Sequence, residues 1–95
     1  MSGGHFDYLQ YRVSELADHL QAIIESPSEY ERGVLQDDNV KQAIYDAYEH
    51  CRLAFIFAHE LDYLISGDTG VDTFKERIIK RLTDLVKDIE NVKTS

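Results

Sequence analysis

Residues 39–66 read NVKQAIYDAYEHCRLAFIFAHELDYLIS, and the turn residues Gly67-Asp68-Thr69-Gly70 follow directly. Apolar or small side chains recur in this stretch at alternating spacings of four and three residues: Val40, Ile44, Ala47, Cys51, Ala54, Ala58, Leu61 and Ile65. This period is typical of a helix face that packs against other helices. The stretch therefore predicts a central helix over residues 39–66, with these eight positions as its packing face, which we call the apolar seam.

The same helix carries a second apolar feature, because residues 53–58 (LAFIFA) are apolar without interruption and must cover the whole circumference. A helix that is apolar on every side is covered on more than one side. At about 1.5 Å per residue it would be roughly 42 Å long. Two companion helices hardly cover such a rod, so we expect a homo-oligomer. The expected interface residues are Leu53, Phe55, Ile56 and Phe57.

A first helix is predicted over residues 6–25, where apolar side chains again step by three and four. Its polar side chains are expected to face outward: Gln10, Glu15, Asp18, His19 and Gln21. Ser26-Pro27 ends it, because the residue before proline avoids the helical region and proline lacks the amide donor.

The remaining segments complete an all-α fold. Ser28 and Glu31 have the spacing of a capping box, which predicts a short helical turn near 28–33. Gly67 is the expected left-handed terminator of the central helix, and a last helix is predicted over 72–92, with residues 91–95 frayed. The sequence thus predicts an antiparallel bundle of three long helices in a single helical domain, residues 1–95.

Composition indicates a folded protein, since 43% of residues are hydrophobic and 29% charged. The net charge is −8, and residues 1–70 carry only four Lys/Arg against thirteen Asp/Glu. Such a surface repels phosphate, so no duplex nucleic acid partner is expected. Neither a membrane-spanning apolar run nor a secretory leader is recognised, and the single cysteine, Cys51, forms no intrachain disulfide. We therefore expect no membrane partner and a cytoplasmic location.

The residues that carry chemistry form no catalytic or metal-binding pattern. The histidines stand at positions 5, 19, 50 and 59, without a Glu-x-x-His or cysteine pair that would complete a metal site. Neither the serines nor the cysteine lie in a nucleophile motif. The prediction is a protein that is not an enzyme, with no metal and no cofactor.

Two helix entrances contain glycines, at Gly3-Gly4 and at residues 67–70. Free backbone amides at such places attract anions, while tyrosine rings stack on bases and arginine holds phosphate. The candidate ligand-binding residues are Gly3, Gly4, His5, Tyr8, Tyr11, Arg12, Asp68 and Arg77. The alternative interpretation is structural, because acidic side chains near both entrances can act as helix caps and tyrosines commonly pack at the margin of a core.

Two stretches carry a family resemblance. The head GGHFDYLQY (residues 3–11) and the segment DYLISGDTGVDTFKER (residues 62–77) resemble a family of small, mostly uncharacterised bacterial and phage proteins. That family supplies no established activity. The resemblance implies that the head and the turn function together.

Two functional hypotheses follow. The first is a non-catalytic oligomeric binding protein that holds a small anionic, nucleotide-like ligand, by analogy with phage proteins that sequester defence signals. The second is an acidic protein-protein adaptor or inhibitor that binds a host protein through the surface around residues 53–58.

Overall fold

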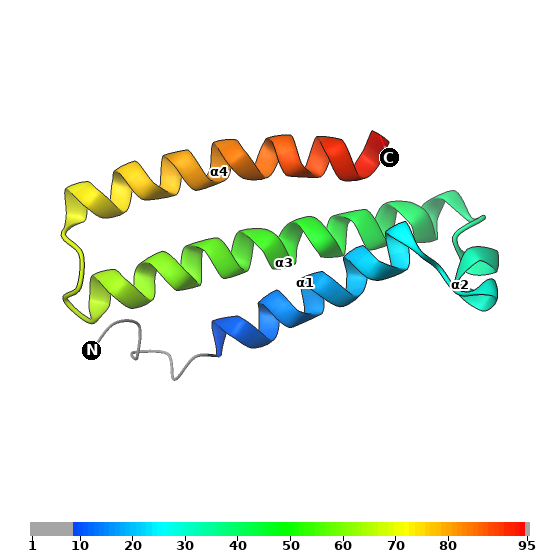
Figure 1. Cartoon of the computed structure of the whole chain (residues 1–95), viewed down its shortest axis with the longest axis horizontal. Helices are drawn as coiled ribbons and strands as arrows, with labels where there is room; N and C mark the ends of the chain where they lie inside the picture. Colours follow the sequence, from blue (N-terminus) through cyan, green and yellow to red (C-terminus); the bar gives the residue numbers. More distant parts are fainter. Residues whose placement is uncertain (1–8, 95) are drawn as a thin grey trace.

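The computed structural model describes residues 9–94, which form four helices: α1 (Gln10–Glu25), α2 (Glu29–Val34), α3 (Asp38–Ile65) and α4 (Val71–Thr94). α3 is the middle helix, with α1 along one side and α4 along the other, and both run antiparallel to it (Figure 1). The prediction of an all-α bundle with three long helices is therefore confirmed.

The ends of the helices differ slightly from the predicted ones. Residues 6–8, where the first helix was expected to begin, lie outside the described part, and α1 is described from Gln10. α3 begins at Asp38 because the Asp37 carboxylate accepts hydrogen bonds from the backbone amides of Asn39 (2.9 Å) and Val40 (3.3 Å). α4 continues to Thr94 instead of fraying after residue 90, because Val92 is buried in the core and holds the last turn.

The short helix α2 follows the predicted capping box. The amide of Glu31 donates to Ser28 Oγ (3.2 Å), and the amide of Ser28 donates to Glu31 Oε1 (2.8 Å). Each contact satisfies a backbone donor that the helix start leaves without an intrahelical partner. α2 therefore forms a compact link between α1 and α3 at one end of the bundle (Figure 1).

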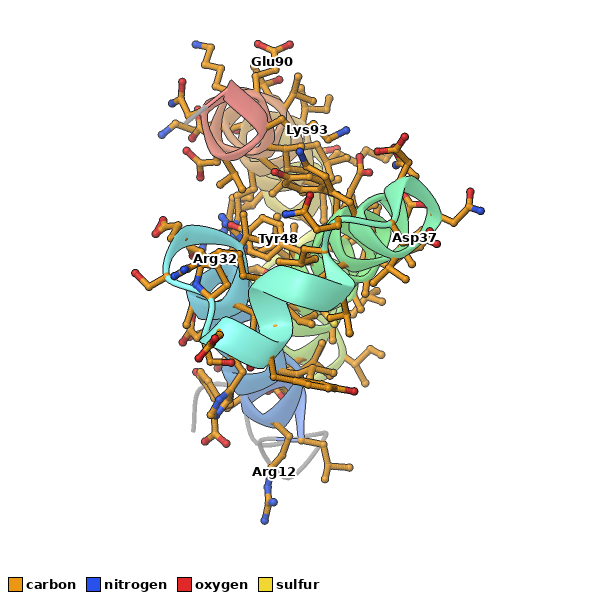
Figure 2. The ribbon with its side chains drawn as sticks, turned by 90° about the vertical axis from the view of Figure 1, so that its right-hand side faces the viewer. Arg12, Arg32, Asp37, Tyr48, Glu90 and Lys93 are labelled. Atoms are coloured by element: carbon orange, nitrogen blue, oxygen red, sulfur yellow. The ribbon has the colours of Figure 1, made fainter. Side chains whose placement is uncertain are left out.

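The core lies where all three long helices face one another. Among the described residues its buried apolar side chains are Ala17 of α1, Tyr48 and Ile56 of α3, and Leu85, Ile89 and Val92 of α4. Tyr48 is 1% exposed and lies between the helices when the bundle is viewed along its axis (Figure 2). Its hydroxyl accepts a hydrogen bond from Arg52 Nη1 (2.6 Å), which satisfies the one polar atom of this central side chain.

The arrangement is open. α1 and α4 each contact α3 far more than they contact each other. The molecule measures 47 × 25 × 18 Å and has a radius of gyration of 15.6 Å, against about 12 Å for a compact domain of this length. Its long, thin shape leaves large parts of α3 uncovered.

The apolar seam is not the face that forms the core, which corrects the interpretation of the central helix. Its positions Val40, Ala47, Ala54 and Ile65 are exposed, and the other four are half-buried. The core uses a different side of α3, which carries Tyr48 and Ile56. Because α3 is apolar on both sides, periodicity alone could not tell which side its own chain covers.

Candidate functional site

Polar and aromatic side chains gather at the end of the bundle where α3 turns into α4. The turn is a Schellman motif: the amide of Asp68 donates to the carbonyl of Tyr63 (2.8 Å), and the amide of Gly67 donates to that of Leu64 (3.2 Å). Gly67 has φ of 83°, a conformation that costs glycine nothing. The reversal returns α4 alongside the last turns of α3.

Glu60 is the centre of this end. Its side chain is 0% exposed, yet both carboxylate oxygens are paired: Arg77 donates from Nε to Oε1 (2.6 Å) and from Nη2 to Oε2 (3.1 Å), and Arg81 donates from Nη1 to Oε2 (2.7 Å). Arg77 and Arg81 are four residues apart, which places them on one face of α4. Two guanidinium groups on one carboxylate fix the register of α4 against α3.

The ion pairs decide the protonation state of Glu60. Burial raises the pKa of its carboxyl, but the hydrogen bonds and positive charges of Arg77 and Arg81 outweigh burial, so the net pKa lies below its ordinary value. Glu60 also raises the pKa of Arg77, chiefly through their hydrogen bonds. Glu60 is therefore ionised. Its single negative charge faces two positive arginines, so the three side chains together carry a net positive charge.

His59 belongs to the same cluster. Burial lowers the pKa of its imidazole and the positive charge of Arg81 lowers it further, while Glu60 opposes both effects. Arg81 Nη1 lies 3.0 Å from His59 Nδ1. Because arginine can only donate, this contact and the lowered pKa both favour the neutral ring with its proton on Nε2, so that Nδ1 accepts from Arg81.

A second buried carboxylate joins the start of α1 to the end of α3. Gln10 Nε2 donates to Asp62 Oδ2 (2.9 Å), with Gln10 3% exposed and Asp62 0% exposed. Gln10 Oε1 is buried and has no hydrogen-bond partner within the described part of the chain. The expectation that Gln10 faces solvent was therefore wrong, because this side chain ties two helices whose sequence positions differ by 52 residues.

Aromatic rings link the two halves of this end. The His59 ring lies 6.1 Å from Tyr11 of α1, 5.3 Å from Phe55 and 4.9 Å from Tyr63, measured between ring centroids. Such edge and offset contacts are favourable beyond the area they bury. We call Gln10, Tyr11, His59, Glu60, Asp62, Tyr63, Arg77 and Arg81 the turn-end cluster.

Next to the cluster is a hollow of about 270 Å³, lined by Tyr63, Asp68, Thr69 and Arg77. Arg77 is 48% exposed in its side chain, and its Nη1 makes no hydrogen bond to any described residue. Thr69 Oγ1 is buried and, in residues 9–94, has no hydrogen-bond partner. The hollow thus combines a guanidinium edge, an unsatisfied hydroxyl, a carboxylate and an aromatic ring. We call it the turn hollow.

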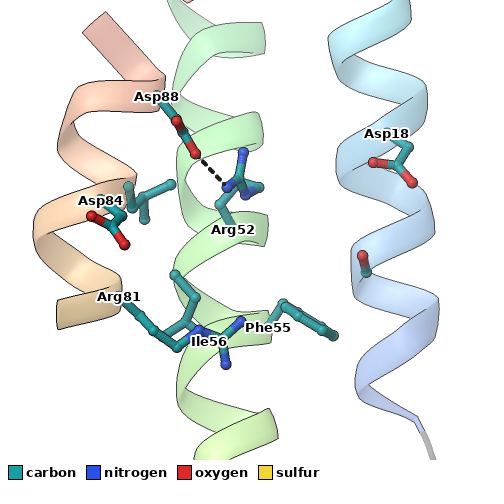
Figure 3. Close-up of a pocket in the computed structure, with 9 residues that line it drawn as sticks. Asp18, Arg52, Phe55, Ile56, Arg81, Asp84 and Asp88 are labelled. Atoms are coloured by element: carbon teal, nitrogen blue, oxygen red, sulfur yellow. Dashed lines mark hydrogen bonds and ion pairs between the residues drawn. The ribbon is translucent and has the colours of Figure 1, made fainter. Parts of the chain in front are cut away.

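A second concave region runs between α1 and α4. Two adjoining hollows of about 310 and 460 Å³ share Arg52 and Asp88, whose side chains form an ion pair (3.1 Å) across the gap between α3 and α4 (Figure 3). Phe55 and Ile56 of α3 form the floor of the first hollow. Its rim carries Asp18 of α1 and Arg81, Asp84 and Asp88 of α4. We call this region the α1–α4 groove.

The structure brings together some of the predicted ligand-binding residues. Tyr11 lies in the turn-end cluster, and Asp68 and Arg77 line the turn hollow beside it. Arg12 points away from the helices into solvent (Figure 2). Gly3, Gly4, His5 and Tyr8 lie outside the described residues.

The four expected interface residues point in different directions. Ile56 is 4% exposed and belongs to the core, and Phe55 is half-buried beneath Tyr11 and His59. Leu53 packs beside the core, whereas Phe57 is 40% exposed. Consecutive residues on a helix point about 100° apart, so only Phe57 of the four is left for an outer surface.

Sequence reasoning missed Gln10, Glu60, Asp62 and Arg81. Glu60 and Asp62 interrupt an otherwise apolar helix end, and Arg77 and Arg81 lie four residues apart on the next helix. Opposite charges on two helices joined by a tight turn were the available signal, because a turn of this length returns α4 beside the last turns of α3.

The class of protein that these features define is a small all-α bundle with a charged aromatic cluster at one end. No family model, curated protein or solved structure matches the chain. Within residues 9–94, no helix is long and apolar enough to cross a bilayer. No group of three or more His, Cys, Asp or Glu side chains in this same range is arranged to hold a metal ion.

Proposed function

We propose that the chain is a non-catalytic binding protein that sequesters a small anionic, nucleotide-like ligand in the turn hollow. The observation that carries the proposal is that two groups able to bind a ligand line the same hollow. Arg77 is half-exposed, and its Nη1 is not used by any described residue. Thr69 has a buried hydroxyl that lacks a hydrogen-bond partner among the described residues. A buried polar atom without a partner is costly. A ligand that hydrogen-bonds Thr69 and pairs with Arg77 would remove that cost.

The lining of the turn hollow suits a nucleotide better than a bare anion. Arg77 offers a phosphate its guanidinium, and the Tyr63 ring offers a surface for a base to stack on. Asp68 already has an interaction partner in the chain, and its negative charge repels a bare anion. At about 270 Å³, the hollow lies just below the usual range of about 300–1,000 Å³, so it has room for about one nucleotide unit.

The same geometry argues for binding without chemistry. A general base needs a free lone pair within reach of substrate. Both oxygens of Glu60 accept hydrogen bonds from arginine, and His59 Nδ1 accepts one from Arg81. These groups are held in structural contacts, which supports a role in shaping the site.

Calorimetric titration of the purified chain with a panel of mononucleotides and cyclic dinucleotides tests this proposal, together with mass spectrometry of ligand released by heat. Thr69→Val keeps the side-chain shape and removes the hydroxyl. We expect its affinity to fall roughly tenfold, the value of one lost hydrogen bond. Its melting temperature should not fall, because an unsatisfied buried hydroxyl is removed.

Thr83→Val is the matched control, since Thr83 is exposed on α4 and its hydroxyl donates only to the carbonyl of Ile79 (2.9 Å). It should bind like the parent chain. If no ligand is released by heating and no nucleotide of the panel gives a heat of binding, the proposed ligand-binding function is refuted. If Thr69→Val and Thr83→Val bind the ligand with equal affinity, the binding site is not the turn hollow.

A second candidate function is an acidic adaptor or inhibitor of a host protein, favoured by the α1–α4 groove. Its apolar floor includes Phe55 and Ile56 from the run at residues 53–58, and three aspartates flank it beside two arginines, Arg52 and Arg81. A basic amphipathic helix matches this lining. Affinity purification tests this function. A host protein that copurifies at fixed stoichiometry would support it over ligand sequestration. Asp84→Lys should abolish the copurification, whereas Asp72→Lys, on the exposed first turn of α4, should leave it intact.

A further inference from the structure

The three long helices share an apolar side that faces away from the α1–α4 groove. On each long helix, an exposed apolar residue stands two positions from a residue that lines the groove. These pairs are Leu16 with Ser14 and Asp18 on α1, Phe57 with Phe55 on α3, and Val86 with Asp84 on α4. Two positions are about 200° around a helix. These side chains therefore point away from the groove, each on its own helix, and we call the exposed large apolar side chains on that side of the three helices the outer face.

The outer face is large. Its six exposed large apolar side chains are Leu16, Val40, Phe57, Ile65, Ile79 and Val86, with exposed fractions between 40% and 67%. Six exposed large apolar side chains are more than the scattered single ones that an ordinary protein surface carries.

The centre of the outer face is a regular stripe on α3. Its positions alternate by three and four residues: Val40, Ala43, Ala47, His50, Ala54, Phe57, Leu61 and Leu64. The first six are exposed and the last two half-buried. Apart from His50 these positions are apolar or small, and a seven-residue repeat of this kind is the pattern of a helix that packs along a second helix. Because its first six positions are exposed, α1 and α4 leave this part of α3 uncovered.

The order of large and small side chains in this stripe selects its occupant. When a second α3 lies antiparallel, with the two-fold axis level with residue 52, each large residue meets a smaller one. The pairs are Val40 with Leu64, Ala43 with Leu61, Ala47 with Phe57, and His50 with Ala54. Large side chains facing small ones interdigitate without voids. A parallel pair would instead place Phe57 against Phe57 and alanine against alanine.

Charge favours the same arrangement. Asp46 is the only acidic residue on this side of α3. The antiparallel register places it level with Ala58 of the other copy, so the two Asp46 carboxylates are about 18 Å apart along the axis. This exceeds the screening length of about 8 Å at physiological salt. In a parallel pair they would lie side by side in a protein that already carries a net charge of −8.

We propose that the outer face is the interface of an antiparallel two-fold dimer in which the α3 helices of two copies pack along the stripe. Each copy presents the same self-complementary surface, as an isologous contact requires. The inference rests on the outer face alone and is independent of the ligand proposed for the turn hollow.

Sedimentation equilibrium tests the dimer, with an expected mass of twice the 11.0 kDa chain at micromolar concentration. Ala54→Glu introduces a charge at an exposed position of the stripe and should yield a folded monomer, with helical circular dichroism retained. Ala22→Glu makes the same change at an exposed position of α1 away from the outer face and should remain dimeric. A monomeric parent chain, or a dimer that Ala54→Glu leaves intact, would overturn the proposal.

The register is tested separately, without a disruptive variant. Spin labels on Asn39→Cys, in a Cys51→Ser background, should be about 39 Å apart, because the antiparallel pair places residue 39 level with residue 65. A parallel pair would bring the labels to about 10 Å, the spacing of packed helix axes, and such a distance would refute the antiparallel dimer.

Discussion

Replacing Glu60 by glutamine tests whether the turn-end cluster holds α3 and α4 together. The wild-type carboxylate is 0% exposed and accepts three hydrogen bonds from Arg77 and Arg81, at 2.6, 3.1 and 2.7 Å. Breaking a buried ion pair costs about 3–5 kcal/mol. Arg77 and Arg81 are 48% and 29% exposed, so water compensates them in part. We therefore expect Glu60→Gln to lower the free energy of unfolding by about 3 kcal/mol, the lower end of that range.

Urea unfolding followed by circular dichroism, at one protein concentration and pH 7, measures this change. With a slope of about 1–1.5 kcal/mol per molar urea, the midpoint should fall by about 2–3 M. The melting temperature should fall by about 12–24 °C. Glu76→Gln, at an exposed position of α4, is the matched control and should change stability by less than about 0.5 kcal/mol. Equal midpoints for the parent and Glu60→Gln would refute the idea that this ion cluster fixes α4.

Four further outcomes follow from the structure. Gly67→Ala should cost about 1–2 kcal/mol, because φ is 83° and no atom lies near the added Cβ. Gly33→Ala, in the helical α2 with equally open surroundings, should stabilise by about 0.5–1 kcal/mol in the same thermal melts. Because the pKa values of His59 and Glu60 are lowered in the folded chain, the unfolded chain binds these protons more readily. The unfolding free energy should therefore fall as pH drops below 6.5 and again below 4.5, with the first decrease absent in His59→Asn. Phe57→Asp should give a monomer by light scattering and keep its helical content, since Phe57 is 40% exposed in the single chain.

The helices could be predicted from the sequence because local signals set them. Pro27 follows the end of α1, the capping box of Ser28 and Glu31 starts α2, and Gly67 terminates α3. Each of these signals acts on the backbone within about one helical turn, so it can be recognised without knowing how the helices pack.

The face of α3 that forms the core could not be predicted in this way. Tyr48 and Ile56 lie on one side, and Ala47 and Ala54 lie on another. Both sides are apolar at a helical period, and the choice depends on where α1 and α4 dock. The apolar seam has the most regular spacing, yet four of its positions are exposed and four half-buried, so the helices of its own chain cover it only in part.

The turn-end cluster lay beyond sequence reasoning because its contacts are distant along the chain. Gln10 reaches Asp62 across 52 positions, and Arg77 reaches Glu60 across 17. Taken singly, Gln10 and Glu60 are polar helix residues, which are mostly exposed. Burial of such groups requires partners that only the packed bundle supplies. The predicted ligand-binding residues therefore included Asp68 and Arg77 but not Glu60, which holds Arg77 in position.

The two proposals together set how the binding sites relate to one another. In the antiparallel dimer Tyr63 of one copy is level with residue 41 of the other, so the two turn hollows are about 33 Å apart along the axis. At that distance direct electrostatic coupling is screened, and the outer face shares none of the residues that line the hollow. We therefore expect one ligand per chain, a non-cooperative isotherm, and the same dissociation constant for the Ala54→Glu monomer as for the parent dimer. A monomer that binds ten times more weakly would show that the hollow is completed across the dimer, and the two sites would then have to be treated as one coupled unit.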